Sequence, residues 1–232
     1  MTDSDKLLEV RNLSVTFGGQ NVIEDINFAL KDGESLIVVG PNGAGKSVLL
    51  RSLLNLIPHK GEIVWRAGAR ISYVPQGFFP EKDIPLSVYE FFCLKNAPQG
   101  KVREILSFVG LHGSVVLNQR IGLLSAGQFQ RVMVAWSLVD DPHVLLFDEP
   151  TSGVDTRGEE TIYSLLRHIK KERNLASILV THDLSVIHTF ADNVLCLNKE
   201  TICYGTPEEI SSPEILRKLY GSDIKIYEHH HG

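Results

Sequence analysis

The fold is decided by one stretch of the sequence, Gly40-Pro41-Asn42-Gly43-Ala44-Gly45-Lys46-Ser47. It matches the pattern G-x-x-x-x-G-K-[ST], in which glycines let successive backbone N–H groups turn inward and bind phosphate oxygens. The apolar run before it, residues 34–39, predicts a strand. Residues 46–56 after it predict a helix, whose positive end adds to the attraction for phosphate. A strand, this loop and a helix in that order predict a nucleotide-binding α/β fold.

The flanking sequence alternates strand and helix signals. Residues 7–17 and 21–30 predict two strands joined by a tight turn at Gly18-Gly19, because glycine readily adopts positive φ angles. Further strands are expected at residues 61–65, 71–75, 144–147, 176–180 and 193–198, and helices at 156–171, 183–190 and 207–220. We therefore predict a single domain over residues 1–232, with a P-loop core, a mostly parallel sheet and an N-terminal antiparallel β subdomain. Within it, an α-helical subdomain is inserted at about residues 77–138, and residues 221–232 form a tail.

The second informative segment is the apolar tract at residues 144–147, which suits a strand buried on both faces and ends in Asp148-Glu149. Phosphoryl transfer depends mainly on charge compensation and positioning. Asp148 is therefore expected to hold the shell of a Mg²⁺ ion together with the Ser47 hydroxyl, while Lys46 neutralises the β- and γ-phosphates. Glu149 is expected to polarise the attacking water. An acidic turn without a catalytic role is the plain alternative.

The third segment is Leu124-Ser125-Ala126-Gly127-Gln128. Taken alone, it is compatible with an ordinary helix N-cap. A Ser hydroxyl and glycine-exposed N–H groups at a helix start also form an anion site. The three segments together, in this order and spacing, resemble the ATP-binding subunits of ABC transporters, and the resemblance covers nearly the whole chain. It implies the ABC ATPase fold, with ATP and Mg²⁺ as cofactors.

The resemblance also implies a head-to-tail pair of identical subunits that encloses two ATP molecules. Ser125 and Gly127 of one subunit would contact the γ-phosphate held by Lys46 of the other. Catalytic roles are implied for Glu149, Gln76 and His182. The implied nucleotide-binding residues are Phe17, Gly40, Asn42, Gly43, Ala44, Gly45, Lys46, Ser47, Val48, Ser125, Gly127, Gln128 and Asp155, and the implied Mg²⁺ ligands are Ser47, Gln76 and Asp148. Phe17 would stack on adenine, and Asp155 would lie where the subunits meet. The alternatives are a position in the hairpin core for Phe17 and a structural role for His182.

Three positions depart from the family pattern. Ala126 replaces a usual glycine, Phe17 stands where tyrosine is common, and Val48 replaces a residue with a hydroxyl group. The first two changes leave Ser125, Gly127 and ring stacking in place. The third is expected to remove one hydrogen bond to the α-phosphate.

The cargo is indicated by weaker features. The short interval from Lys46 to Gln76 and the local sequences around Gly153 and Ile84 resemble those of the branch of ABC ATPases that imports zinc or manganese. The terminal His229-His230-His231 run agrees, because imidazole is a zinc ligand, although a tag remnant or a solvated tail without a role explains it as well. Import of an iron chelate, or export, is the alternative transport function. Aromatic residues at 78–79 and 91–92 predict a groove for a helix of a membrane subunit, or else ordinary core.

Composition limits the other possibilities. The net charge of −5 over 232 residues provides no basic field for nucleic acid, which disfavours an ABC ATPase of nucleic acid or translation. A nucleotide sensor that hardly hydrolyses ATP is disfavoured by Glu149, Gln76 and His182 together. No apolar run is long enough to span a bilayer, so we expect a peripheral protein on the cytoplasmic face of the membrane, bound to permease subunits that a substrate-binding protein serves. The three cysteines are expected to be unpaired and buried.

Overall fold

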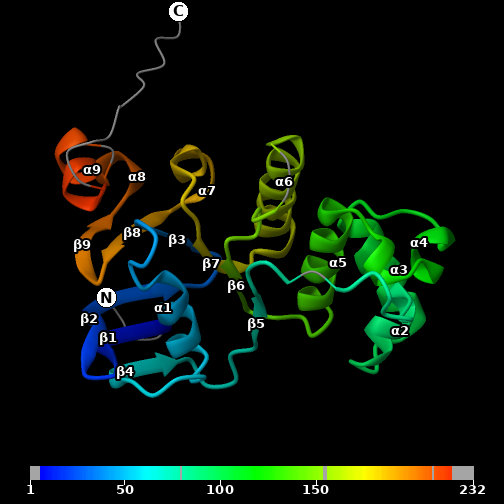
Figure 1. The fold of residues 1–232 in the computed structure, drawn as a ribbon, viewed down its shortest axis with the longest axis horizontal. Helices are drawn as coiled ribbons and strands as arrows, with labels where there is room; N and C mark the ends of the chain where they lie inside the picture. Colours follow the sequence, from blue (N-terminus) through cyan, green and yellow to red (C-terminus); the bar gives the residue numbers. More distant parts are fainter. Residues whose placement is uncertain (1–5, 79, 154–155, 211, 221–232) are drawn as a thin grey trace, which may run out of the picture. The chain divides into compact units, whose positions relative to one another are not determined.

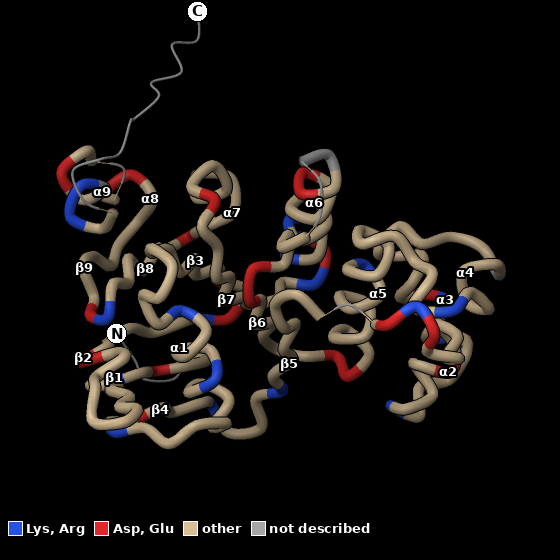
Figure 2. Tube along the Cα trace, in the orientation of Figure 1, with Lys and Arg blue, Asp and Glu red and all other residues tan. Residues whose placement is uncertain are grey.

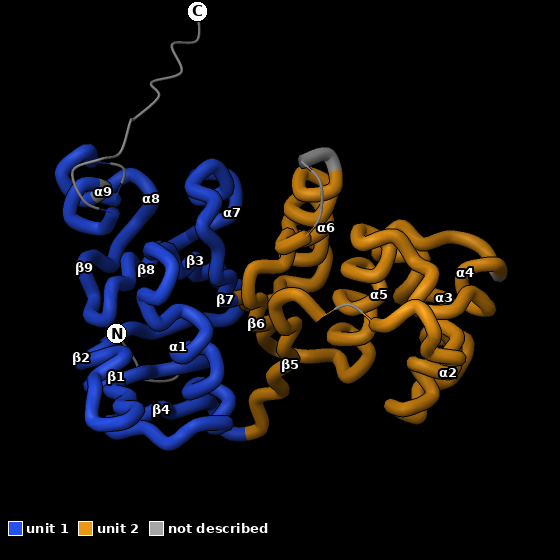
Figure 3. Tube along the Cα trace, viewed as in Figure 1, with its two compact units in different colours: residues 1–67, 178–232 blue, residues 68–177 orange. Residues whose placement is uncertain are grey.

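The computed structural model describes residues 6–78, 80–153, 156–210 and 212–220. The chain forms two compact units, residues 1–67 with 178–232 (unit 1) and residues 68–177 (unit 2), which Figure 3 shows in blue and orange. Asp155, Phe79 and the tail at 221–232 lie outside the described residues. Acidic and basic residues are interspersed along the described chain of both units (Figure 2).

Unit 1 begins with an antiparallel sheet of strands in the order β2-β1-β4 (Figure 1), formed by β1 (Lys6–Phe17), β2 (Gln20–Lys31) and β4 (Lys60–Trp65). The β1–β2 turn contains only Gly18 and Gly19, with φ angles of 56° and 80°. Positive φ at both turn residues matches the twist of the flanking strands. The predicted hairpin is therefore confirmed.

The second sheet of unit 1 contains the strands that position the phosphate loop. Its order is β7-β3-β8-β9, formed by β7 (Ala176–Val180), β3 (Ser35–Val39), β8 (Asn193–Asn198) and β9 (Glu200–Gly205). β3 pairs with β8 in parallel, whereas β9 pairs with β8 in antiparallel orientation. All five residues of β3 are buried, as its uninterrupted apolar sequence predicts. The strand β9 is absent from the sequence prediction.

The helices of unit 1 are α1 (Lys46–Leu53), α7 (Ile187–Phe190, preceded by a 3₁₀ turn at Leu184–Val186), α8 (Pro207–Ile210) and α9 (Pro213–Tyr220). α1 is shorter than predicted, because the chain after it enters the left-handed region at Asn55, where φ is 55°. The predicted helix at 207–220 is divided into α8 and α9, and Pro213 begins α9, where its missing N–H costs nothing.

Unit 2 contains the parallel strands β5 (Ile71–Val74) and β6 (Val144–Asp148) and the helices α2 (Val88–Cys93), α3 (Gln99–Phe108), α4 (Ser114–Asn118), α5 (Ala126–Leu138, after a 3₁₀ turn at Ile121–Leu123) and α6 (Thr156–Arg173). α5 packs against β5 and α6, and α3 packs against α5 (Figure 1). α2 to α5 fall between residues 77 and 138. β7 spans the boundary between the units, because Ala176 and Ser177 belong to unit 2.

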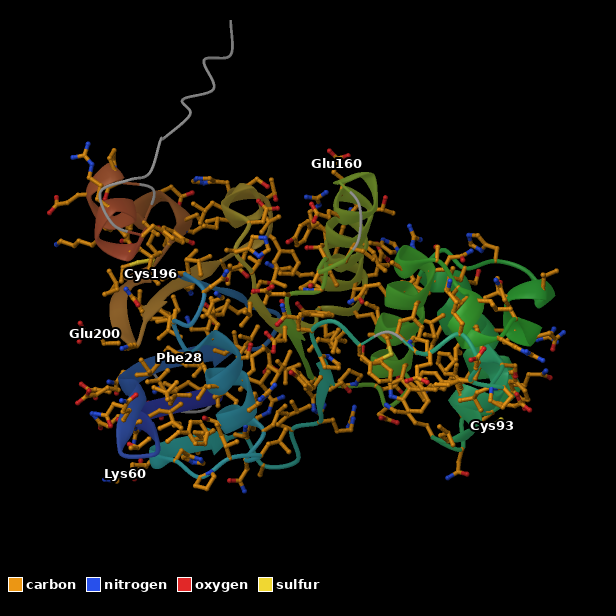
Figure 4. All side chains as sticks on the ribbon, viewed as in Figure 1. Phe28, Lys60, Cys93, Glu160, Cys196 and Glu200 are labelled. Atoms are coloured by element: carbon orange, nitrogen blue, oxygen red, sulfur yellow. A yellow bond between two sulfur atoms is a disulfide. The ribbon has the colours of Figure 1, made fainter. Side chains whose placement is uncertain are left out.

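The expectation that the three cysteines are unpaired and buried is wrong, because two of them are paired and the unpaired one is exposed, although Cys196 is buried. Cys196 of β8 and Cys203 of β9 form a disulfide with a Cα–Cα distance of 4.9 Å (Figure 4, where Cys196 is labelled). The two residues are directly opposite each other in the antiparallel ladder. Because β9 was not predicted, their spacing in the sequence gave no sign of this pairing. Cys93, also labelled in Figure 4, is a free and exposed thiol.

Candidate nucleotide site

The phosphate loop connects β3 to α1 within unit 1. Gly43 and Gly45 have φ angles of 81° and 96°, which L-residues with side chains rarely adopt. Gly40 is required for a different reason: a Cβ atom there would lie 2.0 Å from the backbone oxygen of Leu197. Gly45 is also confined, because a Cβ atom would lie 2.3 Å from Ile23 Cγ2. The three glycines of the motif are therefore fixed by dihedral angles and by neighbouring strands.

Lys46 is the first residue of α1, and its side chain turns back over the loop. Its Nζ donates hydrogen bonds to the backbone oxygens of Gly40 at 2.8 Å and Pro41 at 3.1 Å. A buried ammonium group needs such partners, and only 6% of Lys46 is exposed. Both acceptors belong to the loop, so the positive charge lies where phosphates would bind. Ser47 and Val48 follow in the first turn of α1.

Backbone hydrogen bonds from neighbouring segments support the loop. The N–H of Lys199, just after β8, donates to the oxygen of Ala44 at 3.0 Å. The N–H of Glu24 in β2 in turn donates to the oxygen of Lys199 at 2.7 Å. Asn42 lies at the exposed outer part of the loop. The loop is thus attached to segments that are distant from it in the sequence.

His182 follows β7, close to the strand that carries the phosphate loop. The N–H of Thr181 donates to the oxygen of Val38 in β3 at 3.2 Å, so the carboxyl ends of β7 and β3 lie side by side. His182 is exposed at this edge. Asp183 accepts a hydrogen bond from the N–H of Ser185 at 2.9 Å and so fixes the turn after the histidine. The predicted γ-phosphate contact of His182 is compatible with this position.

Phe17 ends β1 and is 48% exposed. It is therefore not a residue of the hairpin core, and its ring remains available for stacking on adenine. Tyr220, the last residue of α9, was not singled out from the sequence. Burial of its hydroxyl group raises the pKa of Tyr220, and the nearby backbone N–H of Gly40 acts in the opposite direction. The end of α9 therefore lies beside the phosphate loop.

In unit 2 the acidic residues lie at the carboxyl end of β6. Asp148 is 2% exposed and its Oδ2 accepts a hydrogen bond from the hydroxyl of Tyr73 in β5 at 3.2 Å. Tyr73 is a further residue that was not expected from the sequence, because the pairing of β5 with β6 is visible only in the structure. The bond orients the Asp148 carboxylate, whose oxygens are the kind of ligand that Mg²⁺ prefers.

Glu149 lies next to Asp148 and has an unusual backbone conformation. Its φ angle is 46°, which is uncommon for a residue with a side chain and is typical of strained functional positions. Its Oε2 accepts a hydrogen bond from the Gln76 amide Nε2 at 2.7 Å. The structure therefore brings together Gln76 and Glu149, two of the three residues for which catalysis was predicted.

Ser125 is the N-cap of α5. Its Oγ accepts a hydrogen bond from the N–H of Gln128 at 3.2 Å, and the Gln128 Oε1 accepts one from the N–H of Ser125 at 3.0 Å. This reciprocal pair is a capping box, so the capping interpretation is correct. Capping alone does not require Gly127, because, apart from its chain neighbours and the backbone of its own helix, no atom of the described residues lies within 4 Å of where its Cβ would be.

The phosphate loop between β3 and α1 and the acidic pair after β6 define a P-loop nucleoside triphosphatase. The segment Leu124–Gln128 leads into α5, with Ser125 as its N-cap. Residues 23–152 match the family model described as ABC transporter, and this chain belongs to that family. It is an ATP-binding subunit with ATPase activity.

Comparisons with individual proteins agree over almost the full length. The chain is 38% identical over 231 residues to the zinc import ATP-binding protein ZnuC of Yersinia enterocolitica, covering 97% of this chain and 91% of that protein. It is 36% identical over 233 residues to the protein of the same name from Pseudomonas syringae, covering 98% and 88%. The solved structure of cbiO1 from Clostridium perfringens, part of the ABC transporter complex cbiONQ, has a TM-score of 0.77 and 27% identity over 93% of this chain and 94% of its own.

Proposed function

We propose that this ATPase powers the import of a divalent metal ion, zinc or manganese, through a membrane permease. The similarity to zinc import proteins over 97% of the chain carries the choice of zinc. The ATPase part rests on the family and on the two groups of residues at the ends of β3 and β6. Import of an iron chelate, or export, is the second candidate, because the residues of the nucleotide site act on ATP and do not select the cargo.

We assign Mg²⁺ to oxygen ligands at the ends of the two strands. The Asp148 carboxylate, the Ser47 hydroxyl and the Gln76 amide oxygen are hard donors that suit this ion. Bound there, the ion would offset the negative charge that develops on the phosphates. Lys46 would exchange its two backbone acceptors for the phosphate oxygens of ATP, which are stronger partners for an ammonium group.

Glu149 is assigned as the residue that accepts a proton from the attacking water. Its hydrogen bond from Gln76 holds the carboxylate in one orientation, so the proton-accepting oxygen is positioned before ATP arrives. Glu149→Gln keeps the size of the side chain and removes its basicity. We expect turnover to fall by about 100-fold or more while ATP still binds. A Glu149→Gln variant with undiminished turnover would show that the assignment is wrong.

A second copy of the chain is the partner that we assign to Gly127 and Ser125. The space around Gly127 is not filled by the described residues of its own chain, which leaves room for the triphosphate held by another copy. Asp155 is assigned to the same subunit boundary. Gly127→Asp would place a carboxylate against the γ-phosphate, and we expect it to abolish ATP-dependent dimerisation in size-exclusion chromatography.

Gly100→Asp is the matched control for this experiment. Apart from its chain neighbours and the backbone of its own helix, no atom of the described residues lies within 4 Å of a Cβ added at Gly100. This residue lies in the first turn of α3, where an acidic residue is favourable. Monomeric Gly127→Asp should bind ATP as the unchanged chain does. Normal dimerisation of Gly127→Asp would refute the assignment to a second copy, whereas loss of ATP binding in the monomer would indicate a local folding defect instead.

The permease is assigned to an aromatic surface of unit 2. Phe92 is fully buried and belongs to the core, and the half-buried Phe91 stacks on Trp136 with ring centroids 4.1 Å apart. Phe78 differs, because it is 48% exposed while one side of its ring contacts Phe129, with the ring centroids 5.8 Å apart. An exposed aromatic residue with a fixed ring is a typical anchor for a partner helix. None of the described helices is long and apolar enough to cross a membrane.

Two measurements test the permease contact at Phe78 and the identity of the cargo. Phe78→Glu is expected to prevent copurification with the permease while leaving basal ATPase activity intact. The cargo is tested with the permease and its binding protein in liposomes. Zinc or manganese supplied to the binding protein should stimulate ATP hydrolysis, whereas stimulation by an iron chelate alone would favour the second candidate. We also propose that the permease holds the protein at the cytoplasmic face of the membrane.

A further inference from the structure

The disulfide of unit 1 lies in the strand that supports the phosphate loop. Cys196 has no exposed surface, whereas Cys203 is partly exposed on β9, the last strand of its sheet. Their Cα–Cα distance of 4.9 Å lies in the usual range for a disulfide. Cys203 is the more exposed residue of the pair, so we expect a thiol from solution to attack its sulfur.

Residues next to Cys196 contact the loop directly. Cys196 is the register partner of Val39, the residue before Gly40. The next residue, Leu197, presents the backbone oxygen that excludes any side chain at Gly40. Lys199, three positions after Cys196, donates its N–H to the oxygen of Ala44 at 3.0 Å. The backbone between Cys196 and β9 thus forms one wall of the phosphate loop.

We propose that Cys196 and Cys203 are a thiol–disulfide modification site whose oxidation state sets the affinity for ATP. In the oxidised form the S–S bond ties β9 to β8 and holds the Leu197–Lys199 backbone against the loop. In the reduced form β9 is an edge strand with mostly exposed or half-exposed residues, and such elements open locally at low cost. Opening would remove one of the contacts that hold the Leu197–Lys199 backbone, and so loosen the support of Gly40 and Ala44.

The chemistry is ordinary disulfide exchange with a small disulfide as oxidant. The thiolate of Cys203 attacks one sulfur of the oxidant, and the first small thiol leaves. The thiolate of Cys196 then attacks the sulfur of Cys203 in this mixed disulfide, the protein S–S bond forms and the second small thiol leaves. Two protein thiols have lost two electrons and two protons, and one small disulfide has become two thiols. A dithiol reverses both steps.

The test uses the full chain carrying Cys93→Ser, so that the exposed thiol does not react. One portion is treated with oxidised glutathione and the other with dithiothreitol, and mass spectrometry of peptides establishes the state of the Cys196–Cys203 bond in each. Isothermal titration with ATP is then performed on both. We expect the Kd for ATP of the reduced protein to be at least about fivefold higher than that of the oxidised protein. A fivefold change is about the smallest effect usually seen when one site alters the affinity of another.

Cys203→Ser in the same background removes the bond without enlarging the residue. It should bind ATP like the reduced protein and show no response to either reagent. If this variant does not fold, the comparison of the oxidised and reduced parent protein still decides the matter. Absence of the Cys196–Cys203 bond after oxidation would overturn the proposal. Equal ATP affinity in the two forms would also overturn it, even if their melting temperatures differ.

Discussion

Gly40→Ala is the substitution whose effect follows most directly from the structure. The added Cβ would lie 2.0 Å from the oxygen of Leu197 and 3.2 Å from Ala44 Cβ. The first contact must open by about 1 Å before it reaches distances that real Cβ atoms show. Leu197 is fully buried in β8 and cannot retreat at low cost. The phosphate loop must therefore move.

Two magnitudes follow from this displacement. Overpacking of this kind destabilises a protein by about 1–3 kcal/mol, which lowers the melting temperature of a chain this long by roughly 2–4 °C per kcal/mol. A positioning error of about 1 Å costs on the order of 100-fold in catalysis. We therefore expect Gly40→Ala to lose ATPase activity, measured as kcat/KM, far more severely than it loses stability. Activity assays and thermal melts on the same preparation provide both numbers.

Gly100→Ala is the matched control, because it lies in α3 and, apart from its chain neighbours and the backbone of that helix, no atom of the described residues comes within 4 Å of its added Cβ. It should keep full ATPase activity and gain up to about 1 kcal/mol of stability, since alanine favours helix more than glycine does. The reasoning is refuted if Gly40→Ala hydrolyses ATP at the rate of this control. Such a result would mean that β8 moves to relieve the contact and that the phosphate loop keeps its position.

Three further predictions concern single hydrogen bonds. Val48→Thr should tighten ATP binding by about 0.5–1.5 kcal/mol, because the new hydroxyl can donate to the α-phosphate; an unchanged Kd by titration would contradict this. Tyr73→Phe removes the 3.2 Å bond to Asp148, so the Mg²⁺ concentration needed for half-maximal ATPase activity should rise, whereas an unshifted Mg²⁺ dependence would make that bond irrelevant to the ion. The pKa of Glu90 is lowered mainly by the hydroxyl of Ser87 and also by the backbone N–H of Ser87. At pH values above the ordinary pKa of glutamate, the ionised Glu90 therefore stabilises the start of α2, and this stabilisation is lost as the pH falls through the lowered pKa. Ser87→Ala should raise the pKa of Glu90 in an NMR titration, and an unaltered titration would assign the lowering to other groups.

Local sequence predicted the parts of the site that local chemistry determines. The hairpin at Gly18-Gly19, the buried strands β3 and β6, and the loop before Lys46 all depend on residues close together in the chain. Strand β9 escaped prediction, because its pairing with β8 is visible only in the sheet. The disulfide and the bond from Tyr73 to Asp148 were missed for the same reason. The left-handed backbone at Glu149 has no sequence signal, since glutamate rarely adopts it.

The glycines of the phosphate loop and the glycine of the segment Leu124–Gln128 differ in what requires them. Gly40, Gly43 and Gly45 are each required by the chain itself, through the Leu197 oxygen, a positive φ angle or the Ile23 side chain. Gly127 has neither a positive φ angle nor, among the described residues, a neighbour that would exclude a side chain. Folding therefore explains the first group completely and leaves the glycine at 127 without a cause inside its own chain. We propose that the cause lies outside the chain, in the triphosphate on a second copy, and for this reason Gly127→Asp is expected to spare the monomer and abolish the dimer.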